Sequence, residues 1–256
     1  MIRVATKRGK LRRRSASDRL CAGKCAPGKV PDEKRKLLQP LPVLKSIYDA
    51  LFARWGKQKW WPAESPFEVM VGAILTQNTA WRNVEKAIAN LKAANMLDPQ
   101  ALHYAPVGRV AELIRPSGYF NVKARRLKSF LDFYFCAAGG SYARLNAIPT
   151  RDLRQQLLNV NGLGPETVDS ILLYALNRPV FVVDTYTRRI LKRHLIIRGD
   201  ESYNQIREMF EYNLPRGRKL FNEFHALIVR AGHHHCRPTA RCEECPLTVF
   251  ERDETL

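Results

Sequence analysis

The chain has 256 residues, and its 45% hydrophobic content is enough to fill a core in one large domain or two small ones. A formal charge of +19 favours a polyanionic partner, either nucleic acid or an anionic membrane surface. A membrane-spanning protein is excluded, because no apolar stretch reaches the roughly 18 residues that a span needs and no apolar signal-peptide core follows the start. We therefore expect an intracellular protein, in the cytoplasm or with the nucleoid, and leave organelle targeting open.

The first segment, residues 1–39, is predicted to be a basic, disordered tail. Residues 1–36 hold 13 Lys or Arg against 3 acidic residues, so about half of the net charge lies here. No apolar periodicity runs through the segment. Three interpretations are open: a solvated extension, a non-specific tether to DNA, or a presequence for an organelle, since the start is Arg-rich and poor in acids.

The remainder, residues 40–256, is predicted to be all-α. Apolar residues recur at helical spacing almost throughout, and alternation typical of strands is short or absent. We expect helices at 43–55, 66–77, 80–94, 108–115, 121–137, 150–159, 165–177, 185–194, 202–212 and 217–231. They would pack as two lobes, a central one from 60–177 and a second from 40–58 plus 184–256, with a site in the cleft between them.

The turn Asn161–Pro165 is predicted to join two helices as a tight hairpin. Gly162 and Gly164 permit a positive φ and let a foreign backbone approach, Leu163 can insert into the core, and Pro165 suits the first position of a helix. Free N–H groups at the start of the second helix would suit one DNA phosphate. The alternative is an ordinary turn between two helices.

Four motifs resemble the helix-hairpin-helix (HhH-GPD) DNA glycosylase superfamily, and specifically its endonuclease III branch. They are Gly-Leu-Gly-Pro-Glu-Thr at 162–167, Val-Val-Asp-Thr-Tyr at 182–186, Ile-Leu-Thr-Gln-Asn-Thr at 74–79, and the segment 114–124, which is similar to the family's second DNA-contacting loop. The resemblance runs from about residue 43 to 247. It implies a monomeric enzyme of base excision repair that holds damaged double-stranded DNA in the cleft between its lobes and flips out the target base.

The resemblance also assigns roles to residues. Asp184 would stabilise the positive charge that develops on the sugar and orient water, although an Asp before Thr-Tyr-Thr is also an excellent helix N-cap. Gln77 would fill the gap left by the extruded base. The remaining residues expected to contact DNA lie in or beside the hairpin: Asn161, Gly162, Leu163, Gly164 and Thr167.

Glu166 departs from the bifunctional members of the family. In those enzymes a lysine two residues after the second hairpin glycine attacks the sugar and forms a Schiff base. A carboxylate cannot do this, and no Lys lies between Arg151 and Arg189. We therefore expect hydrolysis of the base–sugar bond without strand cleavage. Glu166 itself either stabilises its helix or contacts the base in its pocket.

The damaged base is not specified by the sequence. Alkylated purines, oxidised pyrimidines and mismatched bases are all open, and the missing lysine suggests similarity to relatives that remove alkylated purines. Four aromatic residues could line a stacking pocket, although we expect most of them to fill the core: Trp60, Trp61, Phe67 and Trp81.

Three cysteines near the end, Cys236, Cys242 and Cys245, resemble the superfamily motif in which four thiolates hold a [4Fe-4S] cluster. The first spacing is one residue shorter than usual, and the expected fourth cysteine is Glu251. Three interpretations are open: a cluster with a non-thiolate fourth ligand, zinc bound by three Cys and one His, or no metal. Candidate fourth ligands are Glu251, Asp253, His233, His234 and His235.

Three rival functions also remain at this point. The chain could be a DNA-binding module without catalysis, a basic RNA-binding scaffold, or a bifunctional glycosylase and AP lyase that uses a distant amine.

Overall fold

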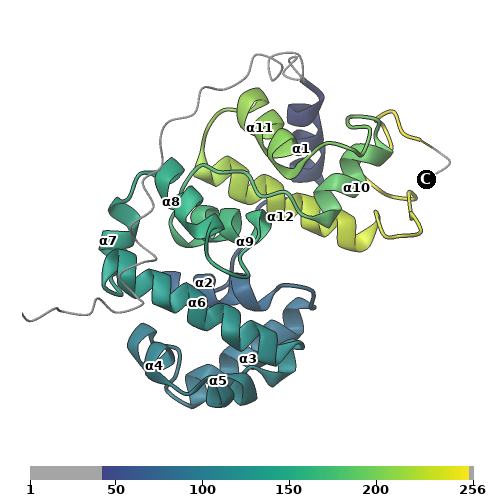
Figure 1. Ribbon diagram of the computed structural model, residues 1–256. Coiled ribbons are helices and arrows are strands. Elements are labelled where there is room, and N and C mark those ends of the chain that lie inside the picture. Colours follow the sequence, from purple (N-terminus) through teal and green to yellow (C-terminus); the bar gives the residue numbers. More distant parts are fainter. Residues whose placement is uncertain (1–41, 254–256) are drawn as a thin grey trace, which may run out of the picture. The chain divides into compact units, whose positions relative to one another are not determined.

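The computed structural model describes residues 42–253, so the predicted basic tail lies outside the described residues. Every regular element in this range is helical, which confirms the prediction of an all-α fold (Figure 1). The elements are α1 (Pro42–Trp55), α2 (Pro66–Leu75), α3 (Trp81–Ala93), α4 (Pro99–Tyr104), α5 (Val107–Leu113), η3 (Arg115–Ser117), α6 (Phe120–Ala138), α7 (Tyr142–Ala147), α8 (Thr150–Leu158), α9 (Pro165–Ser170), η4 (Ile171–Ala175), α10 (Thr185–Arg193), α11 (Tyr203–Asn213) and α12 (Arg218–His234).

Two short helices, α4 and α7, were not among the expected elements. Each has six residues, which is less than two turns and too short for an apolar repeat to show. Their capping residues are nevertheless visible in the sequence. The Asp98 side chain accepts hydrogen bonds from two backbone N–H groups of α4, and the Ser141 side chain caps α7 in the same way.

The helix expected at 165–177 is divided. α9 ends at Ser170, and the chain then continues as the wider turn η4, in which the Leu176 N–H donates to the Ile171 carbonyl five residues earlier. All five residues of η4 are buried, and the element packs against both α2 and α12. This turn therefore links helices that are distant in the sequence.

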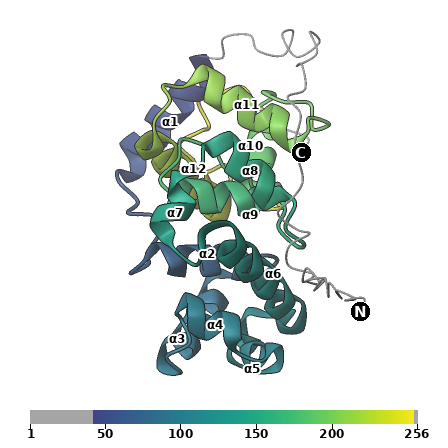
Figure 2. The same ribbon diagram turned by 60° about the vertical axis from the view of Figure 1, so that its left-hand side comes forward.

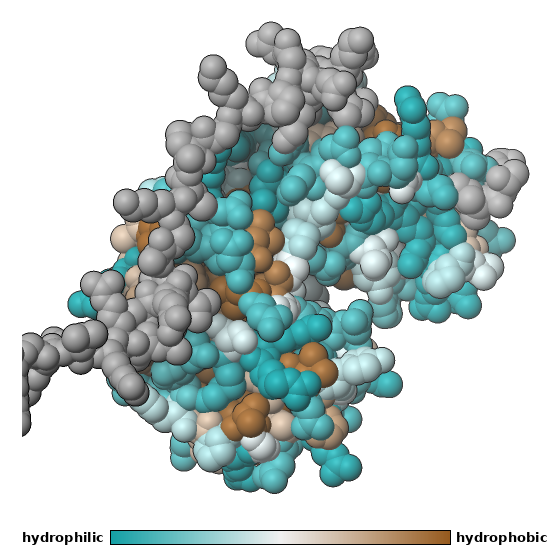
Figure 3. All heavy atoms as spheres, in the orientation of Figure 1, coloured by the Kyte–Doolittle hydropathy of each residue, from teal (hydrophilic) through white to brown (hydrophobic). Residues whose placement is uncertain are grey.

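Helices from the two ends of the described range pack together. α1 contacts α11 and α12, and α10 packs along α12, whereas α3, α4, α5 and α6 form a separate group (Figures 1 and 2). The space-filling view shows a mainly hydrophilic face that is indented between these two groups (Figure 3). The exact lobe boundaries given above stay predictions. None of the helices in residues 42–253 is long and apolar enough to span a membrane.

A buried lysine fixes the beginning of α6 against the end of α2. Lys123 donates to the carbonyl of Leu75 at 2.7 Å and to that of Ser117 at 2.6 Å. These carbonyls end α2 and η3, where a positive charge is favourable. Burial, with a smaller contribution from the charge of Arg126, lowers the pKa of Lys123 to about 8. The lysine thereby positions the segment after α2, which carries Gln77.

Candidate active site

The hairpin has the predicted form, with one difference between its glycines. Gly162 has a φ of 88°, and a Cβ added there would lie 2.3 Å from Arg126 Cγ, so this position requires glycine. Gly164 has a φ of −85° and open space around it, so the expectation of a positive φ there is wrong. Leu163 is 5% exposed and packs in the core, and Pro165 begins α9. The surface beside Gly164 is left free for another molecule.

Gln77, just after α2, binds the hairpin directly. Its Nε2 donates to the Gly162 carbonyl at 3.1 Å and to Thr167 Oγ1 at 2.9 Å, and its Oε1 accepts a hydrogen bond from Arg126. The structure thus brings together residues 85 to 90 positions apart in the sequence. Thr167 is buried beneath Gln77, whereas Asn161 is exposed. The role of Gln77 as a gap filler stays a prediction.

Asp184 caps α10, as its sequence context indicates. Oδ1 accepts from both the N–H and the Oγ1 of Thr187, each at 2.7 Å, and Oδ2 lies 3.7 Å from Nε2 of His225. The side chain is 11% exposed. One carboxylate oxygen is therefore fixed by the helix N-terminus.

Glu166 lies near enough to Asp184 for their charges to interact. Its side chain is exposed at the surface, yet the surrounding protein limits its hydration, and this effect together with the negative charge of Asp184 raises its pKa to about 7. Arg188 opposes the shift. The two carboxyl groups thus differ in their surroundings, since one is held by a helix N-terminus and the other is pushed towards its protonated form.

Three tryptophans gather beside Tyr174, whose hydroxyl is paired with the histidine that faces Asp184. The rings of Trp60 and Trp61 lie 6.0 and 5.0 Å from that of Trp81, and Trp61 lies 5.3 Å from Tyr174, the neighbour of His225. All three tryptophans are half-buried, and Trp61 and Trp81 also line a cavity of about 180 Å³. Phe67, by contrast, packs in the core, as expected.

The comparisons with known proteins show the family of this chain. A family model described as HhH-GPD superfamily base excision DNA repair protein matches residues 71–216. A protein of Methanocaldococcus jannaschii named as a DNA repair glycosylase is 45% identical over 209 residues, which cover 81% of this chain and 95% of that protein. The chain belongs to the HhH-GPD superfamily. It is accordingly a DNA glycosylase of base excision repair.

Solved structures of this superfamily show the same fold. A 3-methyladenine DNA glycosylase of H. pylori, in a structure with 1,N6-ethenoadenine, aligns with a TM-score of 0.64 at 30% identity and covers 79% of this chain and 98% of that one. A non-covalent complex of endonuclease III with DNA aligns with a TM-score of 0.70 at 21% identity and covers 82% and 94%.

The three C-terminal cysteines of this HhH-GPD protein line one pocket of about 410 Å³, together with His194, His235 and Asp253. Within residues 42–253, however, no three His, Cys, Asp or Glu side chains converge closely enough to hold a metal. The described side chains therefore do not fit a cluster as they stand, and no step below depends on one. The metal interpretations stay predictions. Absorption at about 400 nm in anaerobically purified protein tests the iron–sulfur interpretation, since a zinc site and a metal-free site both lack this band.

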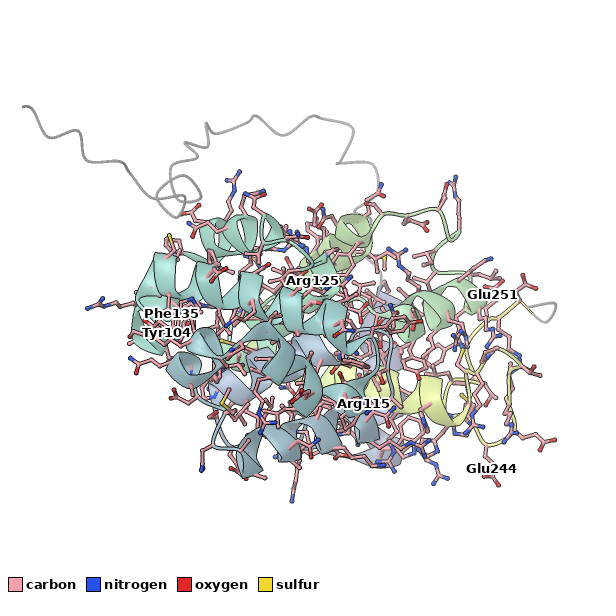
Figure 4. All side chains as sticks on the ribbon, turned by 60° about the horizontal axis from the view of Figure 1, so that its bottom comes forward. Tyr104, Arg115, Arg125, Phe135, Glu244 and Glu251 are labelled. Carbon is pink, nitrogen blue, oxygen red and sulfur yellow. The ribbon has the colours of Figure 1, made fainter. Side chains whose placement is uncertain are left out.

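An arginine organises this C-terminal segment. Arg193 lies 3.2 Å from Cys236 Sγ and donates at 2.6 Å to the carbonyls of both Arg237 and Pro238. Glu251, at the position of the expected fourth cysteine, lies at the outer end of the segment (Figure 4). It does not line the pocket, and neither do His233 and His234.

Sequence reasoning did not single out three residues of this HhH-GPD site. Tyr119 is 71% exposed at a φ of 47°, in the segment that resembles the second DNA-contacting loop. The exposed Arg115 and Arg125, labelled in Figure 4, lie four residues before it and six residues after it in the sequence. The glycine that precedes Tyr119 in the sequence was the available signal for this left-handed conformation. Tyr174 and His225 gave no signal, because each is an isolated polar group in an otherwise apolar helical pattern.

Proposed function

We propose that the protein is a monofunctional glycosylase that hydrolyses the base–sugar bond of an alkylated purine flipped out of double-stranded DNA. The observation that carries this proposal is the pair of unlike carboxyl groups, Asp184 and Glu166, beside the hairpin. The second of these stands where bifunctional relatives have a lysine. A carboxyl pair can support hydrolysis, but it cannot form a Schiff base.

Asp184 supplies the negative charge in this mechanism. As the C1′–N bond breaks, its electron pair leaves with the base and positive charge develops on the sugar. An ionised carboxylate held near C1′ stabilises that charge, and it accepts a proton from the water that adds to C1′. The N-terminus of α10 holds the Asp184 carboxyl group in place.

Glu166 supplies a proton when the leaving base is an uncharged alkylated purine, such as an etheno-adenine. With a pKa of about 7, a large fraction of this carboxyl is protonated at neutral pH and can donate to a ring nitrogen of that base as the electron pair arrives there. A purine that ring alkylation has made cationic leaves as a neutral base and needs no proton. Two carboxyl groups in such different surroundings can act as an acid and a charge stabiliser.

The aromatic cluster supports the choice of an alkylated purine. Trp60, Trp61 and Trp81 present electron-rich rings, which stack on purines and attract the positive charge that ring alkylation introduces. The H. pylori neighbour is a 3-methyladenine glycosylase in complex with an etheno-adenine, which is also an alkylated purine. The net charge of +19 supports binding to the DNA backbone.

A panel of lesion-bearing duplexes tests this proposal, with separate assays for free base and for strand breaks. We expect release of alkylated purines, no release of oxidised pyrimidines or mismatched bases, and no strand breaks. Asp184→Asn should abolish base release while retaining DNA binding. Asp152→Asn, which changes an exposed acid in the first turn of α8, is the matched control and should leave the rate unchanged.

Three results would contradict the proposal. Absence of base release from every duplex would favour a non-catalytic DNA-binding module. Equal rates for wild type and Asp184→Asn would remove the carboxylate from the chemistry. Trapping of a covalent DNA adduct with borohydride would show an amine nucleophile and hence a lyase.

A further inference from the structure

A buried imidazole lies directly behind Asp184. His225, on α12, is 6% exposed, and its Nε2 faces Asp184 Oδ2 at 3.7 Å. This Nε2 is buried and has no hydrogen-bond partner in the described part of the chain, whereas Nδ1 is paired with the hydroxyl of Tyr174. Three elements that are separate in sequence, η4, α10 and α12, thus meet at one ring.

The surroundings of the ring determine which nitrogen carries its proton. Burial raises the pKa of Tyr174 well above its ordinary value, so the hydroxyl keeps its proton and can donate it to Nδ1. Burial also lowers the pKa of His225, although Asp184 opposes this, so the ring is neutral at pH 7. A neutral imidazole carries one proton, which then lies on Nε2 and points towards the carboxylate.

The opposite tautomer is unfavourable. If Tyr174 accepted a hydrogen bond from Nδ1, the lone pair of Nε2 would face the negative Asp184 oxygen within a buried site. The resulting repulsion is stronger there than in water. Phe181 and Tyr174 pack against the ring, and the charged or titratable groups that face it are Asp184 and Tyr174.

We propose that His225 is a positioning residue for Asp184, which donates from Nε2 to Oδ2 while Thr187 holds Oδ1. The inference rests on the proposed role of Asp184 in catalysis. A separation of 3.7 Å is long for a hydrogen bond, but such contacts tighten when a substrate is bound. A neutral donor orients the carboxylate without cancelling the negative charge that the reaction uses.

The first test compares rates of base release under single-turnover conditions. His225→Leu removes the donor and should slow the reaction about ten- to a hundredfold, the usual range for losing a hydrogen bond to a charged group, with DNA affinity unchanged. His225→Gln keeps an N–H in reach of Oδ2 and should restore most of the rate. His103→Gln is the matched control, since His103 also contacts a carboxylate, that of Asp132, but lies on α4.

The second test observes the tautomer directly and needs no activity. In ¹⁵N NMR of the free protein, His225 should show a protonated Nε2 and an unprotonated Nδ1 at pH 7. Tyr174→Phe removes the hydroxyl that holds this tautomer and should shift both ring nitrogens. This measurement also keeps the inference testable if His225→Leu does not fold.

The outcomes separate the two proposals. A protonated Nδ1, or a folded His225→Leu variant with the wild-type rate, overturns the role of His225 alone. An inactive wild type, or an Asp184→Asn variant as fast as wild type, overturns the proposed function instead.

Discussion

Replacing Gly162 with Ala should destabilise the protein, because the hairpin requires glycine at this position. With a φ of 88°, an alanine is strained by about 1–2 kcal/mol. The new Cβ would also lie 2.3 Å from Arg126 Cγ and 2.8 Å from its Cδ, so the arginine must move. If it loses its hydrogen bond to Gln77, a further loss of about 1.5–3 kcal/mol follows, the value of a hydrogen bond involving a charged group.

The sum is about 2.5–5 kcal/mol, which corresponds to a fall in Tm of roughly 5–20 °C for a domain of this size. Urea unfolding followed by circular dichroism measures it. The matched control is Gly164→Ala, at a φ of −85° with nothing within 4 Å of the new Cβ, and it should change the free energy of unfolding by less than about 1 kcal/mol. In a protein that already carries Arg126→Ala, Gly162→Ala should lower the free energy of unfolding only by the backbone strain.

Equal stabilities for the two alanine variants would refute this reasoning. So would a Gly162→Ala penalty that Arg126→Ala leaves unchanged, because the clash with the arginine would then contribute nothing. DNA binding provides a second contrast, since Gly164→Ala, although stable, should weaken affinity if a phosphate approaches the open backbone there.

Three further predictions follow from the described contacts. Because the pKa of Glu166 is about 7 in the folded protein, above its ordinary value of 4.5, its stabilising contribution is complete below pH 4.5 and is lost as the pH rises through 7. Glu166→Gln should therefore raise Tm relative to wild type at pH 8 but not at pH 4; a constant difference across this range would contradict the shift. Arg154→Ala should cost about 3–5 kcal/mol in urea unfolding, because it leaves the fully buried Asp169 carboxylate without the two hydrogen bonds of 2.7 and 2.9 Å that Arg154 donates; a loss below about 1 kcal/mol would argue against this. Tyr119→Ala should keep the wild-type Tm but weaken binding to lesion-bearing DNA by about 1–3 kcal/mol, the value of one stacked base, and unchanged affinity would exclude stacking by Tyr119.

Most of the fold could be predicted from local patterns. The long helices follow apolar residues at helical spacing, and caps such as Ser65 before Pro66 and Ser202 with Gln205 mark where helices begin. The short helices were not predicted, because fewer than two turns show no apolar periodicity. The widened turn η4 was not predicted either, because a continuous apolar run has the same sequence pattern whether its hydrogen bonds span four residues or five.

The parts of the site that are contiguous in sequence were also predictable. The hairpin, the capping position of Asp184 and the replacement of a lysine by Glu166 lie within one stretch of about 25 residues. There, residue type and spacing define the backbone geometry. The same reasoning failed at Gly164, because this glycine does not have a positive φ and instead borders open space.

What the sequence by itself determined is therefore the helical architecture, the hairpin and the capping position of Asp184, the carboxylate proposed to react. Only the tertiary structure decided which residues contact these groups and how the pKa of Glu166 is shifted. Gln77 reaches Thr167 across 90 positions, and His225 faces Asp184 from α12. The pKa of Glu166 rises because folding limits its hydration and brings Asp184 near. Such effects depend on distance in space and on exclusion of water, and a one-dimensional pattern records neither.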